Sequence, residues 1–182
     1  MGTTMEKIIS SLEINKIISI YDNKEDTSGF YCGKLCGSNN KYTMLLHYSK
    51  LGLYGGYILL KTDNIYRIEY DGQYERRVEN LSSITTSQHN ILVNPDDLMG
   101  TILNHAKKEN LVILVELSNS DFDDVKGFVL SYDNETITVK CVNNYGYDDG
   151  ISIFFIKDIS VIKCDNIVCQ ETKLLNEHVK QI

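Results

Sequence analysis

The chain has 182 residues, of which 42% are hydrophobic and 24% charged, a composition typical of a folded globular protein rather than a disordered one. Its formal net charge of −7 disfavours direct binding to nucleic-acid phosphates and favours a basic protein partner. The sequence has no apolar run near the roughly 20 residues that a membrane helix needs, and residues 1–12 lack the apolar core of a signal peptide. We therefore expect a cytoplasmic protein without membrane contact.

A short amphipathic helix is predicted at the start of the chain. Thr4 is placed to cap it, and Met5, Ile8, Ile9 and Leu12 form its apolar stripe. Five short runs rich in β-branched and aromatic residues follow and predict strands. These runs cover residues 17–21, 30–36, 42–48, 57–61 and 65–70. Residues 82–94, rich in Ser, Thr, Gln and Asn, predict a linker.

A second helix is predicted to start at Asn94. Asparagine is a favoured cap, Pro95 suits the first helical position, and Asp96 and Asp97 suit the positive first turn. The apolar stripe of this helix consists of Leu98, Met99, Ile102, Leu103 and Ala106. Strands are predicted at residues 111–117, 127–131, 136–142, 151–156 and 159–163. Residues 173–182 are compatible with a closing helix.

The two halves of the sequence correspond at an offset of 94 residues. The matching pairs are Gly33 and Gly127, Gly52 and Gly146, Gly56 and Gly150, Ile65 and Ile159, Ile68 and Ile162, Asp71 and Asp165, and Leu81 and Leu175. Glycines and spaced apolar positions fix turns and cores, so the offset predicts two tandem copies of one small domain. We expect copies at residues 1–81 and 95–182, joined by the linker 82–94. The predicted class is mainly β with short helices (α+β), each copy being a helix plus a five-stranded barrel.

Motifs for catalysis and for cofactor binding are missing from the sequence. Five cysteines in a chain without an export signal predict free thiols, and neither Cys32-x3-Cys36 nor Cys164-x4-Cys169 has the spacing of a zinc site. The four histidines are scattered, and the sequence contains no phosphate-binding loop, dinucleotide fingerprint or GxSxG motif. We therefore predict a non-enzymatic protein that needs no metal or other cofactor.

Spaced residues of the second copy resemble the two motifs of the Sm-like (LSm) family. The first motif is Val112-x-Leu114, then Gly127-x-Val129 followed four residues later by Asp133. The second motif is the segment 156–162, which reads Ile-Lys-Asp-x-x-x-Ile. The resemblance covers about 50 residues of each copy, and it implies a small SH3-like barrel.

Family members bind a nucleic-acid base with an asparagine four residues after the motif aspartate. Ile137 stands at that place in the second copy and Thr43 in the first. Asp158 replaces the glycine of the second motif, and Asn39 replaces the aspartate of the first motif in the first copy. The resemblance therefore implies the fold without the RNA pocket of the family.

Tyrosines stand beside glycines and acids in two corresponding segments, 48–57 and 143–150. Tyrosine offers a wide contact area at low entropic cost, so such segments are typical of adaptable binding surfaces. We predict partner contacts by Tyr54, Tyr57, Tyr145, Tyr147, Asp148 and Asp149, and by Asp121, Asp123 and Asp124 of another predicted loop. Two other interpretations stay open. The tyrosines could pad a hairpin or the interface between the copies, and the acid pairs could bind divalent metals.

The preferred hypothesis is an acidic binding or inhibitor protein that acts on a basic protein surface, with the second copy as the binder. In size and charge the chain resembles phage-encoded anti-CRISPR inhibitors, and this likeness implies a nucleic-acid enzyme or a ribonucleoprotein as the partner. One alternative is an Sm-like nucleic-acid-binding protein, which needs a lysine-lined face, for example from Lys34, Lys41, Lys50 and Lys61. Another alternative is a metal-dependent nuclease.

Overall fold

The computed structural model describes residues 4–85, 91–118 and 125–181. The protein is mainly β with short helices, as predicted, and every strand pairing given below is antiparallel. The chain divides into two compact units, Met1–Thr101 (unit 1) and Ile102–Ile182 (unit 2). No helix in the described ranges is long and apolar enough to cross a membrane.

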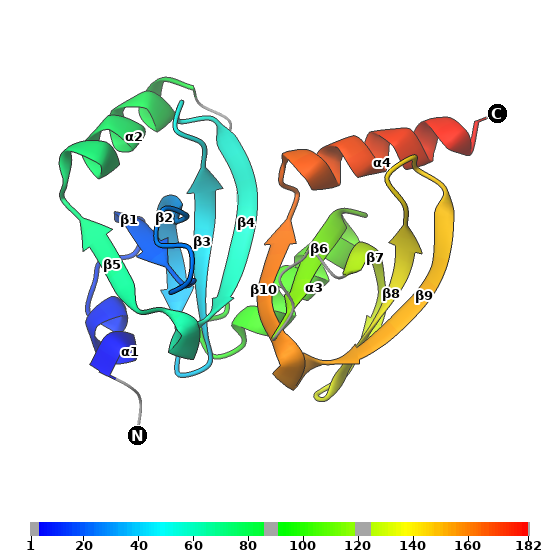
Figure 1. The fold of residues 1–182 in the computed structure, drawn as a ribbon, viewed down its shortest axis with the longest axis horizontal. Coiled ribbons are helices and arrows are strands. Elements are labelled where there is room, and N and C mark those ends of the chain that lie inside the picture. The colour runs from blue at the N-terminus through cyan, green and yellow to red at the C-terminus, as the bar shows by residue number, and fades with distance from the viewer. Residues whose placement is uncertain (1–3, 86–90, 119–124, 182) are drawn as a thin grey trace. The chain divides into compact units, whose positions relative to one another are not determined.

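Unit 1 contains five strands and two complete helices (Figure 1). In chain order they are α1 (Thr4–Ser10), β1 (Ile17–Tyr21), β2 (Tyr31–Ser38), β3 (Tyr42–Tyr48), β4 (Tyr54–Lys61), the 3-10 helix η1 (Thr62–Asn64), β5 (Arg67–Tyr70) and α2 (Gln73–Ile84). Within this unit the strands are ordered β5-β1-β2-β3-β4.

Unit 2 repeats the same order of elements (Figure 1). They are α3 (Leu98–Lys108), whose first turn lies before the unit boundary, β6 (Val112–Leu117), β7 (Val125–Tyr132), β8 (Thr136–Val142), β9 (Asp148–Phe155), the 3-10 helix η2 (Ile156–Asp158), β10 (Ile159–Cys164) and α4 (Ile167–Val179). Its strands are ordered β10-β6-β7-β8-β9. The internal strand order of the two units is therefore the same.

Strand registers repeat at the predicted offset of 94 residues from β2 onward. Gly33 pairs with His47 between β2 and β3, and Gly127 pairs with Cys141 between β7 and β8. Before β2 the offset is 95: Ile17 begins β1 where Val112 begins β6. From the start of its first strand to the start of its second, unit 2 is therefore one residue shorter than unit 1.

A glycine stands in each sheet where the next strand approaches closely. A Cβ atom on Gly33 would lie 2.2 Å from the carbonyl oxygen of Leu46, and one on Gly127 would lie 2.0 Å from the carbonyl oxygen of Lys140. Real Cβ atoms do not come so near to backbone, so only glycine fits at either place. This explains why these glycines correspond in the sequence.

The closing helix of each unit packs on the first strand of its own sheet. In unit 1, Val78 of α2 lies in a buried cluster with Ile17 and Cys32. In unit 2, Cys169 of α4 lies in a buried cluster with Val112 and Leu114. Burial of these apolar side chains is the main stabilising contribution of each helix.

Helix α2 was missed by the sequence analysis, because its polar sequence carries only a narrow apolar face. Val78 is its one buried apolar residue, and Glu75 is buried beside it. The helix extends to Ile84 and so covers the first residues of the predicted linker. Helix α4 starts at Ile167, six residues before the predicted closing helix, and Asn166 caps it by accepting a hydrogen bond from the amide of Cys169 (2.8 Å).

The predicted start of α3 at Asn94 is wrong. Asn94 instead forms a turn in which its carbonyl accepts from the amide of Asp97 (3.1 Å), and Asp97 accepts from the amide of Gly100 (2.8 Å). The helix therefore begins at Leu98. The predicted apolar stripe is confirmed, since all five of its residues are buried: Leu98, Met99, Ile102, Leu103 and Ala106.

Candidate functional site

The turn between β8 and β9 presents two tyrosines to solvent. Tyr145 is 76% exposed and Tyr147 is 58% exposed. The side chain of Asn143 accepts hydrogen bonds from the backbone amides of both tyrosines, at 2.9 and 3.1 Å. Gly146, with φ +85°, donates its amide to the carbonyl of Asn143 (3.1 Å) and closes the turn. The backbone that carries the two rings is therefore fixed by local hydrogen bonds.

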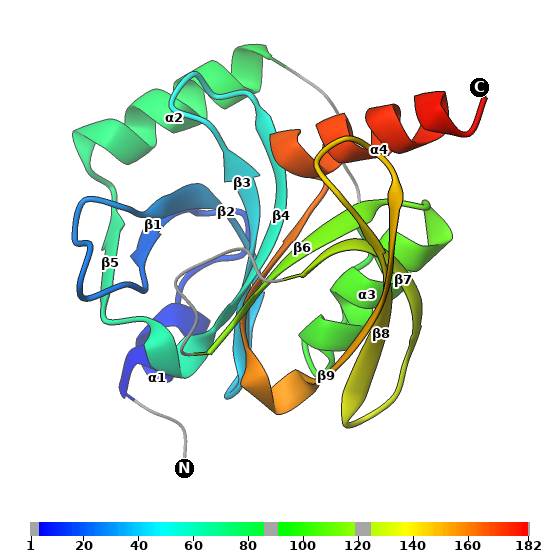
Figure 2. The same ribbon diagram turned by 45° about the vertical axis from the view of Figure 1, so that its right-hand side comes forward.

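Helix α4 holds this tyrosine turn (residues 143–147) from behind, as Figures 1 and 2 show. The buried side chain of Asn176 donates to the carbonyl of Gly146 (2.7 Å). A Cβ atom on Gly146 would lie 2.5 Å from the backbone of Leu175. The Nζ atom of Lys180 donates to the Oδ1 atom of Asn176 (2.6 Å). The turn is thus anchored to a helix 30 residues later in the chain.

Acidic residues begin β9 directly after the tyrosine turn. Asp148 forms an ion pair with Lys140 of β8 (2.7 Å), and this hydrogen bond lowers the pKa of its carboxyl group below the ordinary 3.8. Asp149 is exposed and forms no ion pair with any described residue. The site therefore offers two exposed aromatic rings and one uncompensated negative charge within five residues.

Strand β9 continues from these acids with a row of exposed apolar side chains. Ile151, Ile153 and Phe155 are 66%, 68% and 50% exposed, whereas Phe154 on the opposite face is buried. The corresponding positions of β4 in unit 1 are Tyr57 and Leu59, each 1% exposed, and Lys61. We call Ile151, Ile153 and Phe155 the β9 row.

The structure brings together four of the predicted partner-binding residues, Tyr145, Tyr147, Asp148 and Asp149. In unit 1, Tyr57 lies in the core, where its ring packs edge-on against Tyr54 at 6.3 Å between centroids. Tyr57 is therefore inaccessible to a partner in this conformation, and Tyr54 is half-buried. The predicted contacts Asp121, Asp123 and Asp124 lie outside the described residues.

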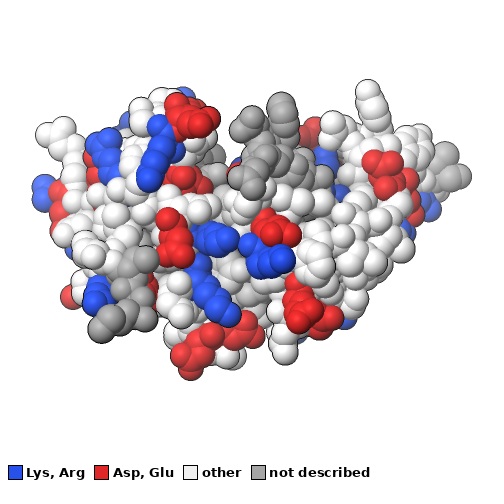
Figure 3. Space-filling view, turned by 60° about the horizontal axis from the view of Figure 1, so that its bottom comes forward, with Lys and Arg blue, Asp and Glu red and all other residues white. Residues whose placement is uncertain are grey.

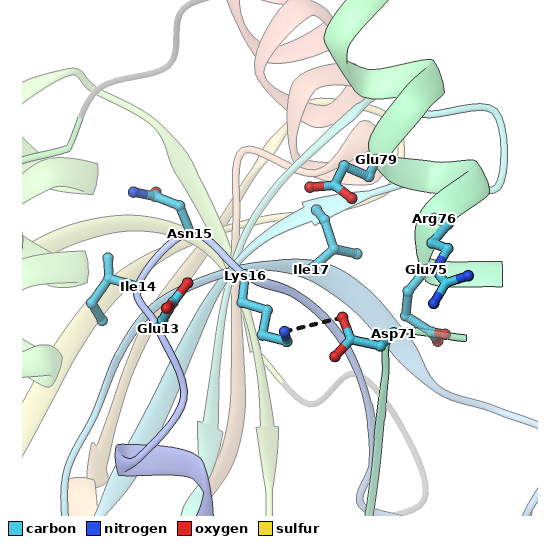
Figure 4. Close-up of a pocket in the computed structure, with 9 residues that line it drawn as sticks. All are labelled: Glu13, Ile14, Asn15, Lys16, Ile17, Asp71, Glu75, Arg76 and Glu79. Atoms are coloured by element: carbon cyan, nitrogen blue, oxygen red, sulfur yellow. Dashed lines mark ion pairs between the residues drawn. The ribbon is translucent and has the colours of Figure 1, made fainter. Parts of the chain in front are cut away.

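Unit 1 contains a polar pocket of about 230 Å³ that the sequence analysis did not identify (Figure 4). Lys16 of the lining pairs with Asp71 (3.0 Å), and the buried Glu75 accepts a hydrogen bond from the hydroxyl of Ser19 (2.5 Å). The lining residues are Glu13, Ile14, Asn15, Lys16, Ile17, Asp71, Glu75, Arg76 and Glu79. Four of them are acids and two are bases, so the pocket suits a polar or cationic group. Its two chain segments lie far apart in the sequence, and neither carries a motif.

Metal-binding and thiol chemistry gain no support from the described residues. Within the described ranges, no group of three or more His, Cys, Asp or Glu side chains could hold a metal ion. The five cysteines are free thiols, as predicted. Burial raises the pKa of the Cys32 and Cys36 thiols to about 11 and that of Cys169 to about 12, so they are protonated at neutral pH.

Basic side chains are interspersed with acidic ones on the face drawn in Figure 3. Two of the lysines named for the nucleic-acid alternative are also engaged: Lys34 lies over the ring of Tyr48 (5.8 Å) and Lys61 has an interaction partner. The chain matches no protein-family description, and comparisons with curated proteins and with solved structures give no match either. The function therefore has to be inferred from the arrangement of its own residues.

Proposed function

We propose that this protein is a non-enzymatic, acidic binding protein that contacts a basic protein surface through unit 2. The observation that carries the proposal is the tyrosine turn: Tyr145 and Tyr147 are exposed on a backbone that Asn143 and Asn176 hold in place. A fixed turn loses little conformational entropy on binding, which favours affinity. Exposed tyrosines on such a turn are suited to contact a partner.

The negative charge of the protein favours a positively charged partner. The net charge is −7, and Asp149 stands beside the turn without an ion-pair partner in the described ranges. An acidic surface accelerates association with a basic protein and makes the complex sensitive to salt. The excess of acids in the unit 1 pocket supports the same preference for cations.

The fold of each unit is proposed to be a small Sm-like, SH3-like barrel. A short helix precedes five antiparallel strands in both units. Two residues of the first Sm-like motif, Gly127 and Asp133, also have structural roles in unit 2. Gly127 allows the close approach of β8, and Asp133 accepts the amides of Glu135 and Thr136 (2.8 and 2.7 Å) in the turn after β7. Ile137 and Thr43, at the base-binding place of the family, are buried. This burial favours a protein partner over RNA.

A narrower form of the proposal is an inhibitor of the anti-CRISPR kind, in which the basic partner is a nucleic-acid enzyme or a ribonucleoprotein. Such partners expose cationic channels that bind phosphates, and an acidic protein can occupy them. The support for this form is the charge and the size of the chain alone. The identity of the captured partner shows whether the protein binds basic proteins in general or inhibits a nucleic-acid enzyme or ribonucleoprotein.

The test is a pull-down from cell extract with the tagged full chain, followed by affinity measurements on the partner recovered. We expect a basic protein whose binding weakens as salt rises. The double variant Tyr145→Ala/Tyr147→Ala should weaken binding at least tenfold, on the order of what loss of an aromatic anchor costs.

The matched control is Leu51→Ala/Leu53→Ala, since these exposed residues occupy the corresponding turn of unit 1. The control should bind like the unchanged protein. Recovery of nucleic acid instead of protein, or equal losses in the two double variants, would reject the proposal.

A further inference from the structure

The β9 row is a line of three exposed apolar side chains on one face of unit 2. Ile151, Ile153 and Phe155 point away from the packed side of the sheet, where Phe154 is buried. Strand β9 is the last strand in the order of its unit, and β8 is its neighbour on one side. A long apolar edge strand is a template for pairing with another strand.

We propose that β9 pairs antiparallel with β9 of a second molecule of this chain, with the two Ile153 residues opposite each other. In this arrangement Ile151 of one strand faces Phe155 of the other, on both sides of the two-fold axis. All three apolar side chains of each molecule then meet apolar partners on the same face. The row is its own complement, as a two-fold symmetric interface requires.

Charge selects the antiparallel direction. Asp148 and Asp149 open β9, and Lys157 follows its end, with its Nζ atom 5.1 Å from the ring centroid of Phe155. An antiparallel pair places the acidic start of each strand near the basic end of the other. A parallel pair would place acids beside acids and lysine beside lysine, which opposes association.

Strand β5, which stands first in the strand order of unit 1, is a poorer partner for the row. Strand β5 has four residues, and Arg67 and Glu69 on one of its faces are ion-paired with each other. Burying that pair against the β9 row would remove both charges from water without a new partner. Strand β9 itself offers the matching length and the matching apolar face.

The test is sedimentation of the full chain over a wide range of concentrations. We expect a monomer–dimer equilibrium in which Ile153→Lys raises the dissociation constant at least tenfold. The control Leu174→Lys places the same charge at an equally exposed apolar residue on α4 and should leave the equilibrium unchanged. Far-UV circular dichroism verifies that both variants are folded.

A disulfide test examines the register. Ile153→Cys should form an intermolecular disulfide on mild oxidation, because opposed strand residues lie within the Cα separation that a disulfide spans. Ile151→Cys should not, since it faces Phe155 of the other molecule. The unchanged protein, with its native cysteines, gives the background.

Three results would overturn the inference: a monomer at every concentration, a dimer that Ile153→Lys leaves intact, or growth into larger open assemblies. The test is independent of the proposed function, because the tyrosine-turn variants should still dimerise. Failure of dimerisation would leave partner binding by the tyrosine turn unaffected.

Discussion

Unit 1 buries a carboxylate where unit 2 buries a thiol. Glu75 of α2 corresponds to Cys169 of α4, and Ser19 of β1 corresponds to Leu114 of β6. In unit 2 the helix meets the strand through an apolar contact, whereas in unit 1 the same contact is a hydrogen bond from Ser19 to Glu75. The closing helix thus packs on the sheet through an apolar contact in unit 2 and through a hydrogen bond in unit 1. The hydrogen-bonded Glu75 also lines the pocket of unit 1.

The corresponding strands β4 and β9 also differ, because apolar side chains that are buried in β4 are replaced by exposed ones in β9. At the positions of the β9 row, unit 1 has the buried Tyr57 and Leu59, while unit 2 exposes Ile151 and Ile153. The two units therefore share their architecture, but unit 1 buries an acidic side chain, Glu75, and unit 2 exposes the apolar β9 row. These differences are where ligand or partner contacts are to be sought.

The largest expected effect comes from breaking what the units share. Gly33→Ala and Gly127→Ala each drive a Cβ atom into the backbone of the next strand, and we expect each to destabilise its unit by about 3 kcal/mol. Urea unfolding followed by circular dichroism measures the loss. The control is Gly150→Ala, where a Cβ atom would meet open space and only the positive φ is unfavourable, costing about 1–2 kcal/mol. Equal losses at all three positions would contradict the close-approach explanation.

A smaller effect comes from converting the chemistry of unit 1 into that of unit 2. Ser19→Ala removes the hydrogen bond to the buried Glu75, and we expect a loss of about 2 kcal/mol in the free energy of unfolding. The double variant Ser19→Leu/Glu75→Cys imports the apolar pair of unit 2 and should recover most of this loss. Urea unfolding of both variants measures the difference. If the double variant is less stable than Ser19→Ala, then the two contacts are not interchangeable.

The smallest effect concerns the charged side of the tyrosine turn. The hydrogen bond from Lys140 lowers the pKa of Asp148, so the ion pair contributes stability above the ordinary pKa of 3.8 and is lost as the pH falls through the lowered value. Lys140→Met should return the pKa of Asp148 toward 3.8. Carboxyl titration by NMR measures it, with Asp133 as an internal control, because backbone amides hold that pKa low. An unchanged Asp148 titration in the variant would show that other groups set its pKa.

Much of the architecture was predictable, because it rests on local signals. The glycine offset predicted the repeat, and the stripe from Leu98 to Ala106 predicted the buried face of α3. The start of α3 was misplaced because asparagine before proline favours a turn as well as a cap. Helix α2 was missed because tertiary packing of Val78 and Glu75, rather than an apolar stripe, holds it.

The candidate site was predictable only in part. Tyr145, Tyr147, Asp148 and Asp149 are neighbours in the sequence, so their proximity needed no fold. The exposure of Tyr145 and the burial of Tyr57 could not be read from the sequence, since both tyrosines lie in the two glycine-rich and tyrosine-rich segments, 48–57 and 143–150, that the sequence alone does not distinguish. The anchor Asn176 and the pocket around Glu75 depend on segments that meet only in the folded chain.

The anchoring of Gly146 by Asn176 sets an order of events during synthesis. Gly146 is synthesised 30 residues before Asn176, so the nascent turn cannot receive the hydrogen bond of Asn176 until α4 has been made. In unit 1, Gly52 packs against Leu81 of α2, which is likewise synthesised later in the chain. The turn at Gly52 and the turn at Gly146 therefore gain their helix contacts only when the closing helix of their unit has been made, which ties maturation of the tyrosine turn to the last helix of unit 2.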